Sequence, residues 1–324
     1  MPNCEKTCPL FSICGGCRYD FTAPDYRTKK LHQIEQWNLS DEPYWTSAGL
    51  RRRADFGFAD GRFGFFERGT KNIIAVENCP NLVPEINKIL PKLAKLPWHG
   101  AGTALVTLCD NGLDVAINSV VPYFTREFKE SVQRLDLLRV SWNGNIVYMT
   151  GTPKIRFGDF VVDYPIGAFL QPTVASEAAM RKFVLENANG AHHIADLFCG
   201  VGNFTFALGA DGHGRDGASK TSVDGFDIAG IGVKRDLFKR PLTAKMLNTY
   251  DLVVMDPPRA GAEAQCRELA CSDVSRVIYV SCNPTTLYRD SKILTAAGYK
   301  MTRIAAFDQF VGTEHWELAI VFQK

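Results

Sequence analysis

The sequence predicts an α/β protein in two parts, a mainly antiparallel α+β domain over residues 1–165 and a doubly wound, Rossmann-like sheet over residues 166–324. In the first part, apolar and polar residues alternate between short polar turns, which is typical of antiparallel strands. In the second part, short apolar runs take turns with helical segments, and this pattern favours a parallel sheet covered by helices.

The composition is that of an ordinary globular chain. Its 324 residues, 46% hydrophobic and 22% charged, are enough for two domains. No apolar run approaches the ~20 residues of a membrane span, and the N-terminus lacks the basic and apolar regions of a signal peptide. We therefore expect a monomer in the cytoplasm without a membrane partner.

Alternating residues identify the strands of the first part. The stretch from Arg51 to Cys79 contains the turn sequence ADGR between two predicted strands, and the stretch from Thr103 to Val121 turns at Asp110, Asn111 and Gly112. A helix is predicted over Val83–Leu93.

Basic residues are dense near the N-terminus although the net charge is only +2. Next to aromatic residues they can grip phosphates and stack on bases, but an exposed basic face that keeps the protein in solution explains them equally well. The residues are Arg27, Lys29, Lys30, Arg51, Arg52 and Arg53.

Four cysteines form a candidate metal-binding set. Cys8, Cys14 and Cys17 have the spacing C-x5-C-x2-C, and Cys79 stands alone further on. Disulfides are rare in the cytosol, and four thiolates suit a [4Fe-4S] cluster or a zinc ion. Zinc sites more often consist of two close pairs, which Cys4 and Cys8 could help to make, so zinc stays an alternative, as does a metal-free set of reduced thiols.

The second part begins with a helix capped by Thr173. A strand, a glycine-containing loop and a helix follow in HHIADLFCGVGNFTFALG, and further strands are predicted in YDLVVMD, RVIYVS, KMTRIAAFDQF and WELAIVFQK. Ligands of such sheets bind at the carboxyl ends of the strands, so Asp196, Asp256 and Cys282 should meet at one edge. Cys282 is thus expected to face a ligand rather than the core.

The glycine loop DLFCGVGNF is not the dinucleotide fingerprint, because Thr205 occupies the position of the third glycine. Together with DPPRAG, SCNP, FLQPT, HWE and the cysteine set, however, the loop resembles the S-adenosylmethionine-dependent RNA uracil-C5 methyltransferases, and this resemblance covers most of the chain. It implies a class I methyltransferase domain. Arg259 after the prolines also argues against amine methylation, which would need an aromatic residue there.

The resemblance also implies the cofactors, the site and the partner. Cys8, Cys14, Cys17 and Cys79 would hold a [4Fe-4S] cluster, with Cys282 as the nucleophile and Glu317 as the general base. The partner would be a structured RNA with an extruded uridine, ribosomal RNA being favoured over transfer RNA. The residues implied for the methyl donor, S-adenosylmethionine, are Gln171, Phe198, Gly200, Asn203, Asp227, Asp236 and Asp256.

Two departures from the family pattern modify these expectations. No segment before Cys4 has room for the N-terminal RNA-binding barrel, the TRAM domain, that some members carry. Between Asp227 and Asp236 there is too little chain for the usual helix and third strand, so the adenosine side of the donor pocket should be abbreviated. A non-catalytic RNA-binding protein with impaired donor binding is therefore kept as the alternative function.

Overall fold

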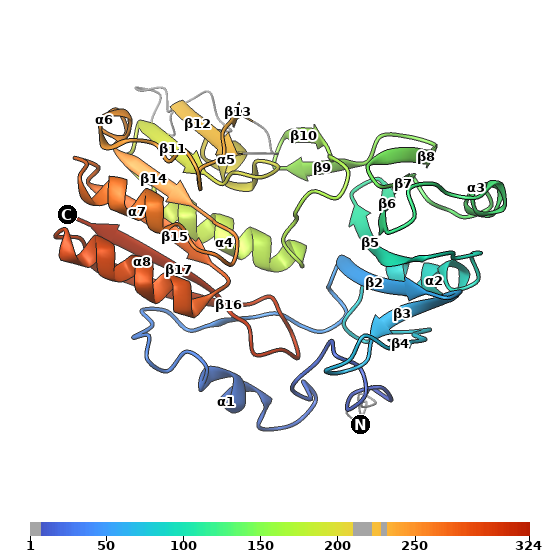
Figure 1. The fold of residues 1–324 in the computed structure, drawn as a ribbon. Helices are drawn as coiled ribbons and strands as arrows, with labels where there is room; N and C mark the ends of the chain where they lie inside the picture. The colour runs from blue at the N-terminus through green and yellow to red at the C-terminus, as the bar shows by residue number, and fades with distance from the viewer. Residues whose placement is uncertain (1–7, 210–221, 228–231) are drawn as a thin grey trace.

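The computed structural model describes residues 8–209, 222–227 and 232–324. Cys4 and most of the glycine-rich stretch before Asp227 lie outside these residues. Figure 1 shows a large sheet flanked by helices and a second sheet beside it. Within the described residues, no helix is long and apolar enough to cross a membrane.

The second sheet has the strand order β4-β3-β2-β5-β6-β7-β8. Its sequential neighbours β2/β3 and β5/β6 are the two predicted hairpins, and both are antiparallel. Asp60 and Gly61 have φ angles of 52° and 74° between β2 and β3, as a tight hairpin turn requires. The strands are β2 (Arg53–Ala59), β3 (Arg62–Phe66), β4 (Ile73–Ile74), β5 (Ala101–Cys109), β6 (Gly112–Ser119), β7 (Arg139–Trp142) and β8 (Asn145–Met149).

Two helices, α2 (Pro84–Leu93) and α3 (Arg126–Val132), accompany this sheet. Ile86, Leu90 and Leu93 of α2 are fully buried at helical spacing against strand residues such as Phe56 and Phe58. A two-stranded ribbon of β9 (Lys154–Phe157) and β10 (Phe160–Asp163) then leads toward the larger sheet (Figure 1).

The larger sheet has the order β1-β16-β17-β15-β14-β11-β12-β13. Strands β12, β11, β14 and β15 run parallel, which confirms the doubly wound prediction, while β17 is antiparallel to both its neighbours. The strands are β1 (Tyr44–Trp45), β11 (His193–Leu197), β12 (Ser222–Asp227), β13 (Val233–Lys234), β14 (Leu252–Met255), β15 (Arg276–Ser281), β16 (Lys300–Asp308) and β17 (Glu317–Gln323).

Helices cover the large sheet on both faces (Figure 1). The predicted cap of α4 is confirmed, since the Thr173 hydroxyl accepts a hydrogen bond from the Ser176 N–H. The strand order reverses between β11 and β14, so a ligand is expected at the carboxyl ends of these two strands. The helices are α4 (Val174–Asn187), α5 (Asn203–Gly209), α6 (Ala244–Leu247), α7 (Glu263–Ala270) and α8 (Pro284–Ala296).

The N-terminal segment also packs on the large sheet. Beyond α1 (Tyr26–Leu31), the buried side chains of Ile34 and Trp37 join the core formed by the strands and helices of the C-terminal part. Strand β1 then pairs in parallel with β16, with Tyr44 opposite Phe307. Sequence patterns do not predict this pairing, because a two-residue strand has no periodicity to recognise.

The link between β12 and β13 is abbreviated, as the sequence predicts. Phe226 pairs with Val233 in parallel, yet only residues 228–232 separate the two strands. A usual parallel crossover needs about a dozen residues or more. The third strand of the fold is therefore reduced to two residues, with no room for a crossover helix.

Candidate active site

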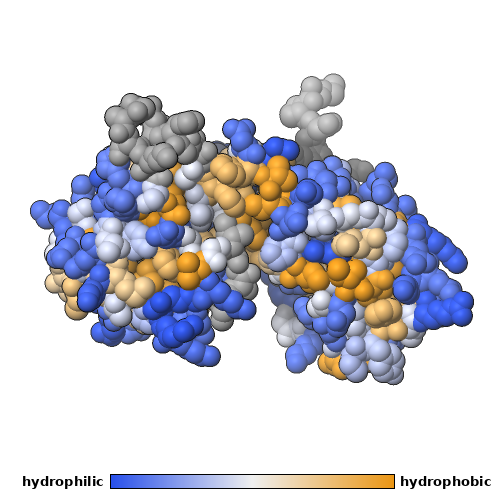
Figure 2. All heavy atoms as spheres, turned by 90° about the horizontal axis from the view of Figure 1, so that it is seen from above, coloured by the Kyte–Doolittle hydropathy of each residue, from blue (hydrophilic) through white to orange (hydrophobic). Residues whose placement is uncertain are grey.

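A cavity of about 1160 Å³ opens at the carboxyl edge of the parallel strands. Figure 2 shows apolar side chains beside the hollow between the two lobes. The residues that the family resemblance implies for the donor, the reaction and the metal all line this one cavity: Cys8, Cys14, Cys17, Cys79, Gln171, Phe198, Gly200, Asn203, Asp227, Asp236, Asp256, Cys282 and Glu317. Asp196, which was expected to meet Asp256 and Cys282 at the same edge, is fully buried and does not line the cavity.

Cys282 lies directly after β15, half-buried at the cavity wall. The next residue, Asn283, caps α8 by accepting a hydrogen bond from the Thr285 N–H, so the chain turns at once. Burial, followed by the nearby carboxyls of Glu317 and Asp256, raises the pKa of the Cys282 thiol to about 12, while Arg259 opposes this rise. A nucleophile at this position therefore needs help to lose its proton.

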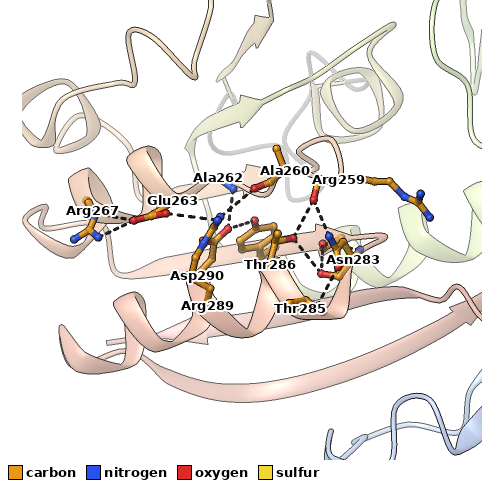
Figure 3. A network of polar contacts seen from close by, with 12 residues as sticks. Arg259, Ala260, Ala262, Glu263, Arg267, Asn283, Thr285, Thr286, Arg289 and Asp290 are labelled. Atoms are coloured by element: carbon orange, nitrogen blue, oxygen red, sulfur yellow. Dashed lines mark hydrogen bonds and ion pairs between the residues drawn. The ribbon is translucent and has the colours of Figure 1, made fainter.

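The loop after Asp256 is fastened to the helix that follows Cys282 (Figure 3). The carbonyl of Arg259 accepts hydrogen bonds from Asn283 Nδ2 at 2.8 Å and from the Thr286 hydroxyl at 3.3 Å. The buried carboxylate of Asp290 accepts the Ala262 N–H at 2.7 Å. These contacts fix the two strand ends that carry Asp256 and Cys282 relative to each other.

The Arg259 side chain points away from this network (Figure 3). Its guanidinium contacts the ring of His315 at 2.7 Å, and burial and Arg259 lower the pKa of that histidine. His315 itself lines the cavity and is half-buried. The Arg259 guanidinium therefore places a positive charge near Cys282.

Glu317 is the first residue of β17 and is 2% exposed. Gln309 Nε2 donates to Glu317 Oε2 at 2.5 Å and to Gln171 Oε1 at 2.9 Å, and Gln171 Nε2 donates to Asp256 Oδ2 at 3.0 Å. Burial and Asp256 raise the pKa of Glu317 well above its usual range, and burial with Asp196 raises that of Asp256 to about 7. Two buried amides thus connect two carboxyls that favour their protonated forms.

The glycine loop after β11 forms the other wall of the cavity. Phe198 and Gly200 have φ angles of 61° and 54°, and the Gly200 N–H donates to Asp227 Oδ2 at 3.1 Å. The Thr205 hydroxyl donates to Asp196 Oδ2 at 2.6 Å, so the residue that replaces the third glycine secures the acid of the preceding strand. The loop backbone can therefore approach a ligand closely.

Asn203 and Asp236 also line the cavity. Asn203 begins α5 and its Oδ1 accepts from Arg181 Nη1 at 3.2 Å. Asp236 Oδ1 accepts the N–H groups of Phe238 and Lys239 at 3.1 and 3.2 Å. The ring centroids of the exposed Phe238 and of Phe198 lie 5.4 Å apart. This aromatic pair was not predicted, because nothing in the sequence distinguishes Phe238 from other surface residues.

The four cysteines share one side of the cavity and are all half-buried. Burial and then the thiols of Cys79, Cys14 and Cys8 raise the pKa of Cys17 to about 12, so the four sulfurs lie within electrostatic reach of one another. In the part of the chain that the structure describes, no three His, Cys, Asp or Glu residues are arranged to hold a metal ion. A cluster is therefore not shown.

Two basic residues of the N-terminal group are buried, contrary to both sequence interpretations. Arg52 is 3% exposed and its Nη2 contacts Glu177 Oε2 at 2.6 Å, which ties the start of β2 to α4. Lys30 is fully buried against Asp308. A buried cation needs a partner, and these two have a structural one.

Comparisons with known proteins identify the family to which the chain belongs. A family model described as tRNA (Uracil-5-)-methyltransferase matches residues 222–324. An uncharacterised RNA methyltransferase of Caulobacter vibrioides is 35% identical over 100% of this chain and 88% of its own length, and one of Agrobacterium fabrum is 37% identical over 100% and 86%. The chain belongs to the RNA uracil-C5 methyltransferase family.

Two further known proteins are similar to this methyltransferase. The 23S rRNA (uracil(1939)-C(5))-methyltransferase RlmD of Salmonella typhi is 29% identical over 98% of the chain and 81% of its own length. The crystal structure of Pyrococcus abyssi tRNA (uracil-54, C5)-methyltransferase with S-adenosyl-L-homocysteine has a TM-score of 0.71 at 19% identity, over 98% of this chain and 87% of that one. The second likeness confirms the fold.

Proposed function

We propose that this methyltransferase transfers a methyl group from S-adenosylmethionine to C5 of a uridine in ribosomal RNA, through a covalent bond between Cys282 and C6. The observation that carries the proposal is the shared cavity, in which the Cys282 thiol, the buried Glu317 carboxyl and the glycine loop line one space. The resemblance to RlmD over almost the whole chain supports ribosomal RNA as the substrate.

The chemistry accounts for both residues. C5 of uracil is a weak nucleophile, so the Cys282 thiolate adds to C6 and the ring becomes an enolate. C5 then attacks the methyl carbon of the sulfonium, whose sulfur leaves with the bonding electrons. The Glu317 carboxylate takes the C5 proton, and elimination breaks the C6–S bond and restores the thiolate. The uridine must be extruded from its stack to reach this cavity.

The cation beside Cys282 gives the thiolate electrostatic support. Arg259 lowers the pKa that burial raises, and its contact with His315 keeps the guanidinium at the cavity. We infer that Arg259 aids thiolate formation when the base is bound. Glu317 must be ionised to accept the C5 proton, and the hydrogen bond from Gln309 favours that ionised form.

The glycine loop is the proposed donor site. Phe198 and Gly200 line the cavity with positive φ angles, and Asp227 lies at the end of β12, where an acid can accept ribose hydroxyls. We assign the donor contacts to Gln171, Phe198, Gly200, Asn203, Asp227, Asp236 and Asp256. Because β13 has only two residues, we expect the adenosine end to be more open than usual.

We also propose that Cys8, Cys14, Cys17 and Cys79 hold a [4Fe-4S] cluster with a structural or RNA-positioning role. Two observations support this proposal, although the described side chains are not arranged as a metal site. The four half-buried thiols line one cavity, and the Gly16 N–H and Asn81 Nδ2 each donate to a sulfur at 3.3 Å, as outer-shell groups do around such clusters. Anaerobically purified protein should contain about four irons per chain. Stoichiometric zinc without iron would contradict the assignment.

One experiment tests the reaction and its substrate. Total RNA from cells without this gene is separated into ribosomal and transfer RNA, and each is incubated with the protein and S-adenosylmethionine. Nucleoside mass spectrometry should find new 5-methyluridine in the ribosomal fraction, in an amount stoichiometric with one site. New methylation in transfer RNA alone would reassign the substrate.

A protein that only binds RNA would form 5-methyluridine in neither ribosomal nor transfer RNA. The abbreviated β12–β13 link is the observation that keeps this alternative. Donor binding separates the two functions, since S-adenosylmethionine at a hundredfold excess over its dissociation constant should stabilise a competent enzyme by about 2.7 kcal/mol. No change in melting temperature would favour the RNA-binding protein.

A further inference from the structure

Residues 309–316 form the loop that carries the chain from β16 to Glu317 at the start of β17. Its first end is fixed by buried polar contacts. The Lys30 ammonium pairs with the Asp308 carboxylate, both fully buried, and also donates to the Phe310 carbonyl at 2.9 Å. Tyr26 donates to the other Asp308 oxygen at 2.9 Å. The N-terminal segment therefore holds the base of this loop.

The tip of the loop is held by the turn that follows Cys17. The Gly312 carbonyl accepts the N–H groups of Arg18 and Tyr19 at 2.7 and 2.8 Å, and the Gly312 N–H donates to the Tyr26 hydroxyl at 3.0 Å. Gly312 has a φ angle of 79°, and a Cβ there would lie 2.9 Å from Cys17 Sγ. The loop thus touches the sulfur so closely that only glycine fits.

The Asn81 side chain contacts both the Cys17 sulfur and the loop of residues 309–316. Its Nδ2 donates to Cys17 Sγ at 3.3 Å and to the Val311 carbonyl at 3.1 Å, and the residue is only 8% exposed. A part-buried carbonyl that loses such a donor must find another partner, which costs free energy unless the loop moves. Asn81 therefore couples the position of a cysteine sulfur to the position of the loop.

We propose that Asn81 and the turn of Cys17, Arg18 and Tyr19 are positioning elements for Glu317. They hold residues 309–316 so that the Glu317 carboxylate faces the cavity, and a change at the Cys17 sulfur displaces the general base. This inference rests on the proposed function, because it assigns proton abstraction to Glu317. It gives the cysteine segment a part in one step of the reaction, in addition to any part in RNA binding.

The experiment compares two asparagines. Asn81→Ala removes the contact with the loop. Asn87→Ala is the matched control, because Asn87 holds the Cys79 backbone with bonds of 2.8 and 3.0 Å and its side chain reaches only Cys79 and Leu82 in the contacts that the structure describes. Gly312→Ala is a second test variant, which pushes the loop away from Cys17 while Asn81 and all cysteines keep their own side chains. Melting temperatures identify any variant that does not fold.

Two readouts are made on each folded protein. Hydrogen exchange of the amides of residues 309–317 should be accelerated at least about tenfold in Asn81→Ala and Gly312→Ala, but within about twofold of wild type in Asn87→Ala. Release of tritium from C5 of uridine in RNA should be slowed about tenfold or more in the two test variants, with KM for RNA unchanged and a covalent protein–RNA species accumulating.

The two readouts distinguish failure of the positioning role from failure of the proposed function. Unchanged exchange in both test variants, or the same acceleration in Asn87→Ala, would overturn the positioning role, whatever the protein catalyses. Accelerated exchange with normal tritium release would also overturn it, since Glu317 would then remove the proton without these positioning contacts. Accelerated exchange in the two test variants of a protein that methylates no RNA at all would support the positioning contacts and contradict the proposed function.

Discussion

Gln309 donates a hydrogen bond from Nε2 to Glu317 Oε2 across 2.5 Å. The same nitrogen donates to Gln171 Oε1, and Gln171 donates to Asp256, so the proposed base and the donor-side acid are joined through two buried amides. Burial and Asp256 raise the pKa of Glu317, and the Gln309 hydrogen bond is the contact that lowers it. Gln309 therefore helps to keep Glu317 able to accept a proton.

Gln309→Ala should make the reaction more dependent on alkaline conditions. Without the hydrogen bond the pKa of Glu317 rises further, so a smaller fraction is ionised at neutral pH. We expect kcat at pH 7 to fall about tenfold and the rising limb of the pH–kcat profile to move to higher pH. The profile is measured by methyl transfer to RNA between pH 6 and 10. A profile that keeps its wild-type position would show that Gln309 does not tune Glu317.

Asp196→Asn should change how stability depends on pH. Burial raises the pKa of Asp196 in the folded protein to about 7, against about 3.9 when unfolded. Between these values the unfolded chain releases a proton that the folded protein retains, so rising pH favours unfolding. The stability present below about pH 4 is thus lost by about pH 7.

An asparagine cannot ionise, so the melting temperature of Asp196→Asn relative to wild type should be higher at pH 8 than at pH 5. Thermal unfolding at both pH values checks this. Asp159→Asn, at an exposed residue before β10, controls for the substitution itself. A difference that stays constant with pH would mean that Asp196 is ionised in the folded protein.

Local patterns in the sequence predicted those parts of the fold that local physics determines. The turn at Asp60 and Gly61 and the cap at Thr173 depend on neighbouring residues, and both are confirmed. The arrival of Asp256 and Cys282 at one cavity follows from the rule that parallel strands end at the same edge. The motifs were thus sufficient to place the candidate site on the correct edge.

Long-range contacts were not predictable. Lys30 reads as an exposed cation because its partner, Asp308, is distant in the sequence, and only the fold brings the two together. The pairing of β1 with β16 leaves no pattern in two residues. Gln309 reads as one polar residue among several at the end of a strand, although it is 1% exposed. Its role depends on side chains from three separate segments.

Asp227→Ala should weaken donor binding. The Asp227 carboxylate lies at the end of β12 and accepts the Gly200 N–H, so its loss removes a charged acceptor and loosens the glycine loop. A hydrogen bond to a charged group is worth about 1.5–3 kcal/mol, so the dissociation constant for S-adenosylmethionine should rise roughly 10- to 100-fold. Titration calorimetry measures this constant.

The matched control lies on the same strand. Asp224 is exposed and accepts a hydrogen bond from the Tyr250 hydroxyl at 2.8 Å, and it does not line the cavity. Asp224→Ala should therefore leave the dissociation constant within about twofold of wild type. If Asp227→Ala behaves like this control, Asp227 does not bind the donor.

Cys282→Ala and Glu317→Gln should fail at different steps. Cys282→Ala has no sulfur to add to C6, so it should form no adduct and transfer no methyl group, a loss of several orders of magnitude in rate. It should still bind RNA, because phosphate contacts provide most of the affinity and the thiol makes none. Glu317→Gln can add the thiolate and accept the methyl group, but it cannot remove the C5 proton.

Denaturing gels distinguish the two variants. With S-adenosylmethionine and substrate RNA, a protein–RNA species should accumulate with Glu317→Gln and be absent with Cys282→Ala. A cysteine that only fills the wall of the cavity predicts another result, since its alanine variant would lose some stability and keep its turnover. Methylation by Cys282→Ala at the wild-type rate would therefore exclude the covalent mechanism, because no other step in the scheme activates C5.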